Sequence, residues 1–196
     1  MGQISQLCDE ILQEHLKLGR DLDRLLLPGL SKAKVISSTS ILPITLPKTA
    51  AELFTWRNGT QTGIASFYDM ALFPVWYLMS LNEATSTYVD FQREFPDLLD
   101  RRYFPLFSSG AGDFIGIDCG ENRGADGKIA CYRQATGTVI EFENLKIMLR
   151  TILDSFRSNV FLISDEGRFK TNRTQFREIA KRLNPSLERW SPEESD

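Results

Sequence analysis

The chain has 196 residues, about the length of one domain at a rough prior of one domain per ~150 residues. Hydrophobic residues make up 42% of the sequence and charged residues 25%, a globular composition that argues against disorder. The net charge of -3 argues against a protein built mainly to wrap nucleic acid, because such proteins are usually far more basic.

Neither the N-terminus nor any apolar run has the features of a targeting or membrane segment. No apolar run approaches the ~18–20 residues that span a bilayer, and the N-terminus lacks the basic and apolar regions of a signal peptide. The three cysteines, Cys8, Cys119 and Cys131, are an odd number at no framework spacing, which is typical of reduced thiols. We therefore expect a soluble, cytoplasmic protein with a single domain over residues 1–190, no membrane contact and no cofactor.

The N-terminal segment, residues 1–28, has a helical pattern. Apolar residues from Ile4 to Leu26 recur at three- and four-residue steps, which predicts one amphipathic helix. Gly19 is placed to bend or break this helix, and Pro28-Gly29 is expected to end it.

The next stretch contains a second, shorter helix. Residues 30–45 are rich in Ser and Thr, and the pattern does not show whether residues 28–45 are ordered. Pro47 suits the first turn of a helix, and Asn58-Gly59 predicts a left-handed stop after it. The apolar and aromatic residues 64–79 are interpreted as a strand or an irregular core segment.

A capping box begins the third helix. Ser80 and Glu83 have the spacing with which two side chains satisfy exposed N–H groups at a helix start. Apolar residues then follow on one helical face up to Phe95, and Pro96 is expected to close the element.

From Tyr103 onward the pattern changes to short strands. Four segments separated by Gly- and Ser-containing turns predict an antiparallel meander: residues 103–107, 113–119, 128–133 and 138–142. A helix over 145–156, a strand over 160–163 and a helix ending at Asn184 follow, and the acidic tail 191–196 is expected to be frayed. The predicted fold is α+β, with a mixed or antiparallel sheet of about five or six strands flanked by helices at both chain ends.

The only histidine, His15, would have to serve any Ser-His-Asp or Cys-His site. A packed helix histidine is the favoured interpretation. Cys8 is seven residues away, a rise of ~10.5 Å along a helix, which is too far for both to bind one zinc ion. No metal site is predicted.

Cys119 and Cys131 flank one loop, so a hairpin could place them nearly opposite each other. Cross-strand Cβ atoms lie ~4.5–5.5 Å apart, slightly more than the ~3.8 Å of a disulfide. Two buried thiols are favoured over a redox pair.

Two loops resemble ligand-binding motifs only in part. The Gly-rich residues 108–113 lead into a strand rather than a helix, which favours a turn over a phosphate loop. The loop 118–127 has alternating oxygen-bearing residues, but Arg123 stands where a calcium loop requires glycine. Its three carboxylates, Asp118, Glu121 and Asp126, could instead face a basic partner.

The last helix region is basic. Its basic residues are Arg168, Lys170, Arg173, Arg177, Lys181 and Arg182. The favoured interpretation is that they form a solvated face, and the alternative is a docking or nucleic-acid patch. No pair of carboxylates stands out as a hydrolytic site, although two acids can converge from any part of a fold. No catalytic residue is assigned.

Short motifs occur in a fixed order over residues 40–185. The first are Leu46-Pro47, Trp56-Arg57-Asn58-Gly59, Leu78 and Ser80-Leu81-Asn82-Glu83-Ala84. The later ones are Phe104-Pro105-Leu106-Phe107, Gly112-Asp113-Phe114-Ile115-Gly116-Ile117-Asp118, Gly127-Lys128-Ile129 and Phe142-Glu143-Asn144-Leu145. In this order they resemble the SUKH superfamily, which includes the yeast cell-wall-synthesis regulators of the Smi/Knr type and many bacterial immunity proteins.

The resemblance implies an α+β fold without catalytic residues and a function in protein binding, often the neutralisation of a contact-dependent or polymorphic toxin. We therefore expect a non-enzymatic immunity protein against a nuclease-type toxin, with a protein partner, no small-molecule substrate and no nucleic acid. Asp118, Glu121 and Asp126 are the predicted partner-binding residues, because acidic side chains would complement the basic cleft of a nuclease. The alternatives are an intracellular regulatory scaffold and an enzyme with a carboxylate site.

Overall fold

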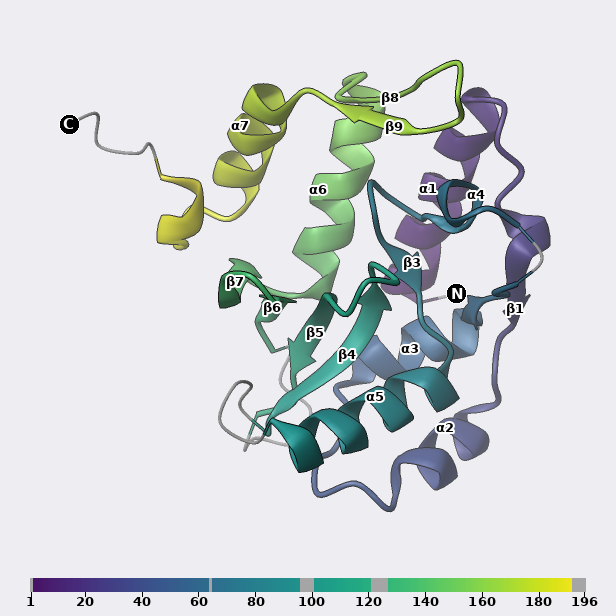
Figure 1. Ribbon diagram of the computed structural model, residues 1–196, viewed down its shortest axis with the longest axis vertical. Coiled ribbons are helices and arrows are strands. Elements are labelled where there is room, and N and C mark those ends of the chain that lie inside the picture. The colour runs from purple at the N-terminus through teal and green to yellow at the C-terminus, as the bar shows by residue number, and fades with distance from the viewer. Residues whose placement is uncertain (1, 64, 96–100, 121–126, 192–196) are drawn as a thin grey trace.

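The computed structural model describes residues 2–63, 65–95, 101–120 and 127–191 (Figure 1). Its centre is a five-stranded antiparallel sheet in the order β3-β4-β5-β6-β7. The strands are Tyr77–Leu78, Tyr103–Ser108, Phe114–Asp118, Ile129–Arg133 and Gly137–Phe142. The predicted α+β class and the meander are confirmed, and β3 lies inside the stretch interpreted as strand or irregular core.

Helices and two small ladders surround this sheet. In the described residues the ladders are β1 (Leu26–Pro28) with β2 (Arg57–Thr60) and β8 (Phe161–Ile163) with β9 (Phe169–Thr171). The α-helices are α1 (Gln3–Lys17), α2 (Lys32–Thr39), α3 (Lys48–Trp56), α4 (Phe67–Met70), α5 (Leu81–Glu94), α6 (Leu145–Arg157) and α7 (Arg173–Leu183). Two 3₁₀ helices, η1 (Asp23–Leu25) and η2 (Glu188–Trp190), complete the set.

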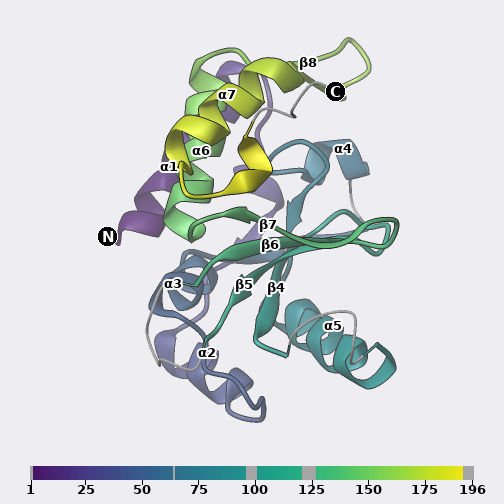
Figure 2. The ribbon, with the colours of Figure 1, turned by 90° about the vertical axis from the view of Figure 1, so that its left-hand side faces the viewer.

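Each face of the sheet packs against a different layer, because successive side chains of a strand point to opposite faces. Ile115, Ile117 and Cys131 belong to the main core, which α1, α3 and α6 also fill. Phe114 and Tyr132 point the other way and pack in a second cluster against Phe91 of α5, with ring centroids 5.2 and 4.7 Å away. Figure 2 accordingly shows α6 and α7 on one side of β6 and β7 and α5 on the other.

Side-chain caps begin two of the predicted helices. Ser80 Oγ accepts a hydrogen bond from the Glu83 N–H at 3.1 Å, and the Glu83 carboxylate accepts one from the Ser80 N–H. The capping box of α5 is therefore confirmed. Asn144 caps α6 by accepting from the Ile147 N–H at 2.9 Å. The predicted closure at Pro96 and the tail after Ser191 lie outside the described residues.

The predicted break at Gly19 is confirmed, but the prediction of an α-helical pattern up to Leu26 is wrong. Helix α1 ends at Lys17, and Gly19 has a φ of 74°, a left-handed conformation that glycine adopts without steric cost. The apolar periodicity continues past Gly19 because Leu22, Leu25 and Leu26 are also buried. These residues belong to an irregular segment and η1 rather than to an α-helix. Residues 30–45, for which no element was predicted, contain α2.

The Trp56-Arg57-Asn58-Gly59 motif joins four elements rather than forming a left-handed helix stop. Arg57 is extended, with a φ of -144°, so α3 runs directly into β2. The Trp56 Nε1–H donates to Asp9 Oδ1 of α1 at 2.7 Å, and Asn58 Oδ1 accepts from the Leu81 N–H of α5 at 3.0 Å. The motif therefore fastens α1 and α5 to the end of α3.

Gly59 is required at this junction for two reasons. Its φ is 89°, and a Cβ atom there would lie 2.3 Å from the Ser80 backbone nitrogen. We expect Gly59→Ala to lower the free energy of unfolding by about 2–4 kcal/mol, from left-handed strain plus a backbone clash. Urea denaturation measures this loss.

Gly19→Ala is the matched control, since Gly19 also has a positive φ but no atom within 4 Å of a built Cβ. It should cost only about 1–2 kcal/mol. Equal losses in the two variants would contradict the close approach of Gly59 to α5.

Candidate functional site

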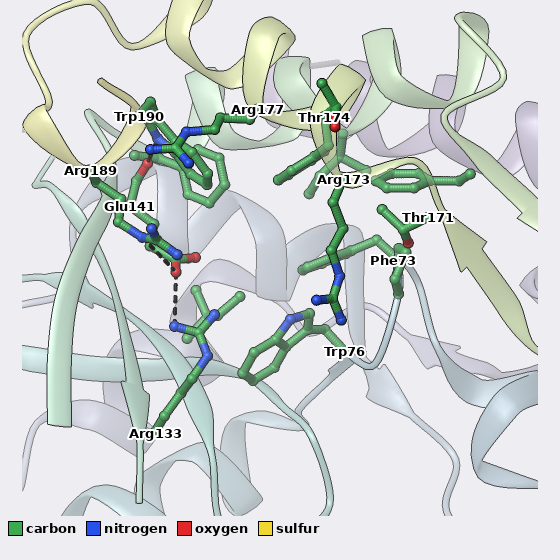
Figure 3. A pocket seen from close by; sticks show the side chains of 16 residues that line it. Phe73, Trp76, Arg133, Glu141, Thr171, Arg173, Thr174, Arg177, Arg189 and Trp190 are labelled. Atoms are coloured by element: carbon green, nitrogen blue, oxygen red, sulfur yellow. Dashed lines mark hydrogen bonds and ion pairs between the residues drawn. The ribbon is translucent and has the colours of Figure 1, made fainter. Parts of the chain in front are cut away.

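A pocket of about 460 Å³ lies between the sheet and the C-terminal segment (Figure 3). Its most deeply buried lining residues are apolar: Ile115 of β5, Phe142 of β7, Ile152 of α6 and Phe161 of β8. Helix α7 and η2 form the opposite wall with Phe176 and Trp190 among their residues. A volume of this size is within the range of ligand-binding pockets.

Among the residues that the structure describes, four arginines and one carboxylate line the pocket. Arg133 comes from the end of β6, Arg173 and Arg177 from α7, Arg189 from η2, and the described acidic residue is Glu141 of β7. Figure 3 shows the four side chains reaching the pocket from both walls. The excess of positive charge makes the pocket attractive to anions, which the planar guanidinium group of arginine binds through two parallel hydrogen bonds.

Glu141 holds two of these arginines in place. Its side chain is only 8% exposed, and Oε1 lies 2.9 Å from Arg133 Nη1 and 3.8 Å from Arg189 Nε. Burial acts to lower the pKa of Arg133, but the Glu141 carboxylate more than offsets this effect and the pKa is raised. Arg133 therefore stays charged at the pocket wall.

The C-terminal segment returns to the sheet through Trp190 and Asn184. The Trp190 Nε1–H donates to the Glu141 carbonyl at 2.6 Å, and the Trp190 ring packs against Phe142 and Phe176, each with a centroid distance of 5.8 Å. Buried Asn184, which ends α7 as predicted, accepts from the Glu143 N–H at 3.0 Å. These contacts fix η2 beside β7 and close one side of the pocket.

A tight turn before β3 places Trp76 on the other side. The Trp76 N–H donates to the Phe73 carbonyl at 2.9 Å, and the Leu72 N–H donates to the Trp76 carbonyl at 2.8 Å. Between them Val75 has a φ of 66° although it is β-branched and 57% exposed. Such a conformation is strained, and exposed residues of this kind concentrate at functional sites.

The predicted acidic site lies elsewhere. Asp118 is at the end of β5, does not line the pocket and has an 18% exposed side chain. Its Oδ1 accepts from the Gly120 N–H at 2.8 Å and lies 3.9 Å from Arg102 Nε. Glu121 and Asp126 lie outside the described residues, so a common site for the three acids stays a prediction.

The basic residues near α7 divide into two sets. Arg173 and Arg177 line the pocket, whereas Arg168 lies over the Tyr68 ring at 4.9 Å and Arg182 pairs with Asp154 at 3.3 Å. The sequence spacing of Arg173 and Arg177 relative to the apolar residues of α7 indicates that these two face the protein. Arg173 and Arg177 each precede a residue of the apolar stripe, Phe176 and Ala180, by three positions, which places them on the face of α7 that turns toward the protein.

The cysteines are buried free thiols, as favoured by the sequence. Cys119 and Cys131 are not opposite each other, because the register pairs Cys131 with Ile115, four residues before Cys119. Burial raises the pKa of each of these thiols to about 12. They are therefore neutral and poorly nucleophilic near neutral pH.

His15 is a packed core histidine, which confirms the favoured interpretation. It is fully buried, its Nε2–H donates to the Leu72 carbonyl at 2.8 Å, and its ring lies 5.0 Å from that of Phe156. Burial and the nearby Arg20 lower its pKa to about 4. Within the described ranges, no group of three or more His, Cys, Asp or Glu side chains is arranged to hold a metal ion.

The profile of the SMI1/KNR4 family (SUKH-1) matches residues 29–158. The chain belongs to this family. No curated protein matches the sequence. SUKH-1 proteins are in general non-catalytic and act by binding other proteins, in toxin immunity or in SMI1/KNR4-type roles.

The SUKH-1 match covers the central sheet and α6 but ends before β8, β9, α7 and η2. Arg133, Glu141 and Trp76 thus belong to the matched region, whereas Arg173, Arg177 and Arg189 follow it. In the part of the chain that the structure covers, no helix has both the length and the hydrophobicity for a membrane crossing.

The pairing of Glu141 with two arginines can be tested by removing its charge. We expect Glu141→Gln to lower the free energy of unfolding by about 1–2 kcal/mol, a value discounted because both arginines are partly exposed. Chemical denaturation at low salt measures the loss. The exposed Glu178 of α7 supplies the control, since Glu178→Gln should stay within about 0.5 kcal/mol of the parent. A parent-like Glu141→Gln protein would show that the carboxylate does not organise the wall.

His15 predicts a loss of stability in weak acid. Because its folded pKa of about 4 is below the ordinary 6.5, the neutral form is stabilised above pH 6.5 and the advantage is lost as the pH falls toward 4. The contribution approaches about 3 kcal/mol over that window. His15 is the only histidine, so NMR titration reads its pKa directly. A value of 6 or above would contradict the buried, neutral ring.

Proposed function

We propose that the chain is a non-enzymatic immunity protein that binds and neutralises a bacterial toxin of the nuclease type. Membership of the SUKH-1 family carries this proposal, because proteins of that family act by binding other proteins. The chemistry of the described residues is consistent with it. The single histidine is neutral and buried, and the thiols are protonated, so neither supplies an activated nucleophile or base.

Binding would neutralise a toxin by covering its active site or its substrate path. A stable protein–protein interface buries about 800 Å² on each partner, enough to block the cleft of a small enzyme. Asp118, Glu121 and Asp126 are proposed to face the basic cleft of the nuclease and to accelerate association electrostatically. A role of the SMI1/KNR4 type, as an intracellular regulatory scaffold, is the second candidate, and membership of the SMI1/KNR4 family supports it.

The direct test is complex formation with the toxin encoded next to the gene of this chain. We expect a one-to-one complex with a dissociation constant of about 10 nM or below and stoichiometric loss of toxin activity. Surface plasmon resonance and a nuclease assay measure the two quantities. A toxin that stays fully active beside an excess of the chain would contradict the immunity role and favour the regulatory one.

A charge-neutralised variant tests the acidic contribution. Asp118→Asn, Glu121→Gln and Asp126→Asn together should slow association about threefold to tenfold at low salt, with a smaller effect at high salt. Asp21→Asn, on the exposed side of the N-terminal segment, is the control and should leave the rate unchanged. Unchanged association kinetics in the triple variant would show that these three acids do not contribute to the interface.

A further inference from the structure

The pocket is assembled from two parts of the chain that differ in their relation to the family. The matched region supplies Trp76, Arg133 and Glu141, and the segment after residue 158 supplies Arg173, Arg177 and Arg189. Proteins that share a core but bind different partners must differ at the residues that select the partner. The second wall of this pocket lies beyond the family match, so its residues are free to differ between family members that bind different partners.

The charge of the pocket selects an anion. Glu141 occupies Arg133 and Arg189, so their guanidinium groups are pre-oriented and partly neutralised. Arg173 makes no ion pair with any residue in the described ranges, and Figure 3 shows its side chain pointing from α7 across the pocket toward Trp76. Arg173 is exposed, so a carboxylate entering here would form a charge-assisted hydrogen bond with a guanidinium group that is also in contact with water.

The remaining lining selects an apolar group beside that anion. Trp76 and Trp190 come from opposite walls, and the lining also includes the buried side chains of Ile115, Ile152 and Phe161. Val75, which stands in the sequence between the lining residues Pro74 and Trp76, is exposed and has a left-handed conformation. Aromatic residues together with arginine are the side chains most enriched at protein–protein contacts.

We propose that this pocket binds an acidic segment of the protein partner, with a carboxylate paired to Arg173 and a neighbouring apolar side chain inserted between Trp76 and Trp190. Arg177, which donates a hydrogen bond to the Ser191 carbonyl, adds positive charge to the same wall. This proposal rests on the proposed protein-binding function and adds the chemistry of the segment that is recognised. A protein segment fits better than nucleic acid, because the pocket is bounded at about 460 Å³ and the chain has a net charge of -3. A polyanion needs an extended basic surface.

The probe is a synthetic hexapeptide with a central Leu-Phe pair flanked by two acidic residues on each side. Isothermal titration calorimetry should give a dissociation constant of about 10–100 µM for the acidic peptide. Its Asn/Gln counterpart should not bind measurably. Because two of the three tryptophans line the pocket, binding should also change the intrinsic fluorescence.

Two charge-matched double variants separate the pocket from general attraction. Arg173→Gln with Arg177→Gln should weaken peptide binding at least tenfold. Lys170→Gln with Lys181→Gln removes the same charge from exposed positions outside the pocket lining and should change binding less than twofold. Equal weakening in both would overturn the proposal, as would pocket-dependent binding of a single-stranded RNA hexamer at higher affinity than the acidic peptide.

Val75→Gly separates an effect on binding from an effect on stability, because it is not expected to destabilise the fold. Glycine accepts a φ of 66°, so this variant should melt at the parent temperature or above it while binding the acidic peptide about threefold more weakly. Parent-like affinity in a protein that melts higher would show that the strained turn at Val75 does not position Trp76 for binding. The outcome is independent of the toxin assay, since the peptide is measured on the isolated chain.

Discussion

The carboxylate of Glu141 links the region that matches the family to the C-terminal segment after residue 158. Its side chain pairs with Arg133 of β6 and Arg189 of η2, while its backbone carbonyl accepts a hydrogen bond from the Trp190 indole Nε1–H. Because the group is buried, its charge must be compensated locally, and the only described side chains that pair with it are these two arginines. Together with the contacts of Asn184 and Trp190, this pairing holds the C-terminal segment, and with it the second wall of the pocket, against β7.

The rest of the molecule provides a rigid frame for that wall. Trp56 and Asn58 tie α1 and α5 to the end of α3, and α6 packs its apolar face between α1 and the sheet. The family match covers most of this frame. The structure thus combines a common core, which holds the sheet edge in place, with a C-terminal segment that adds three arginines and a tryptophan to it.

Local signals made much of the fold predictable. The capping box at Ser80 and the apolar stripe of α6 depend on neighbours within one or two helical turns, and both were found from the sequence. The break at Gly19 is predictable from the residue itself, but the irregular segment after it is not, because Leu22 and Leu25 keep the helical spacing. The pocket was missed because Glu141 and Arg189 are 48 positions apart, and the basic character of α7 alone does not distinguish a solvated face from a pocket wall.

Hydrogen–deuterium exchange of the chain, free and in complex with its toxin, tests most directly whether the C-terminal segment forms the recognition site. We expect the largest protection on binding at α7, η2 and the turn containing Val75, with smaller changes at the end of β5. Protection confined to the α2 and α5 side of the sheet, with none on α7 or η2, would contradict it.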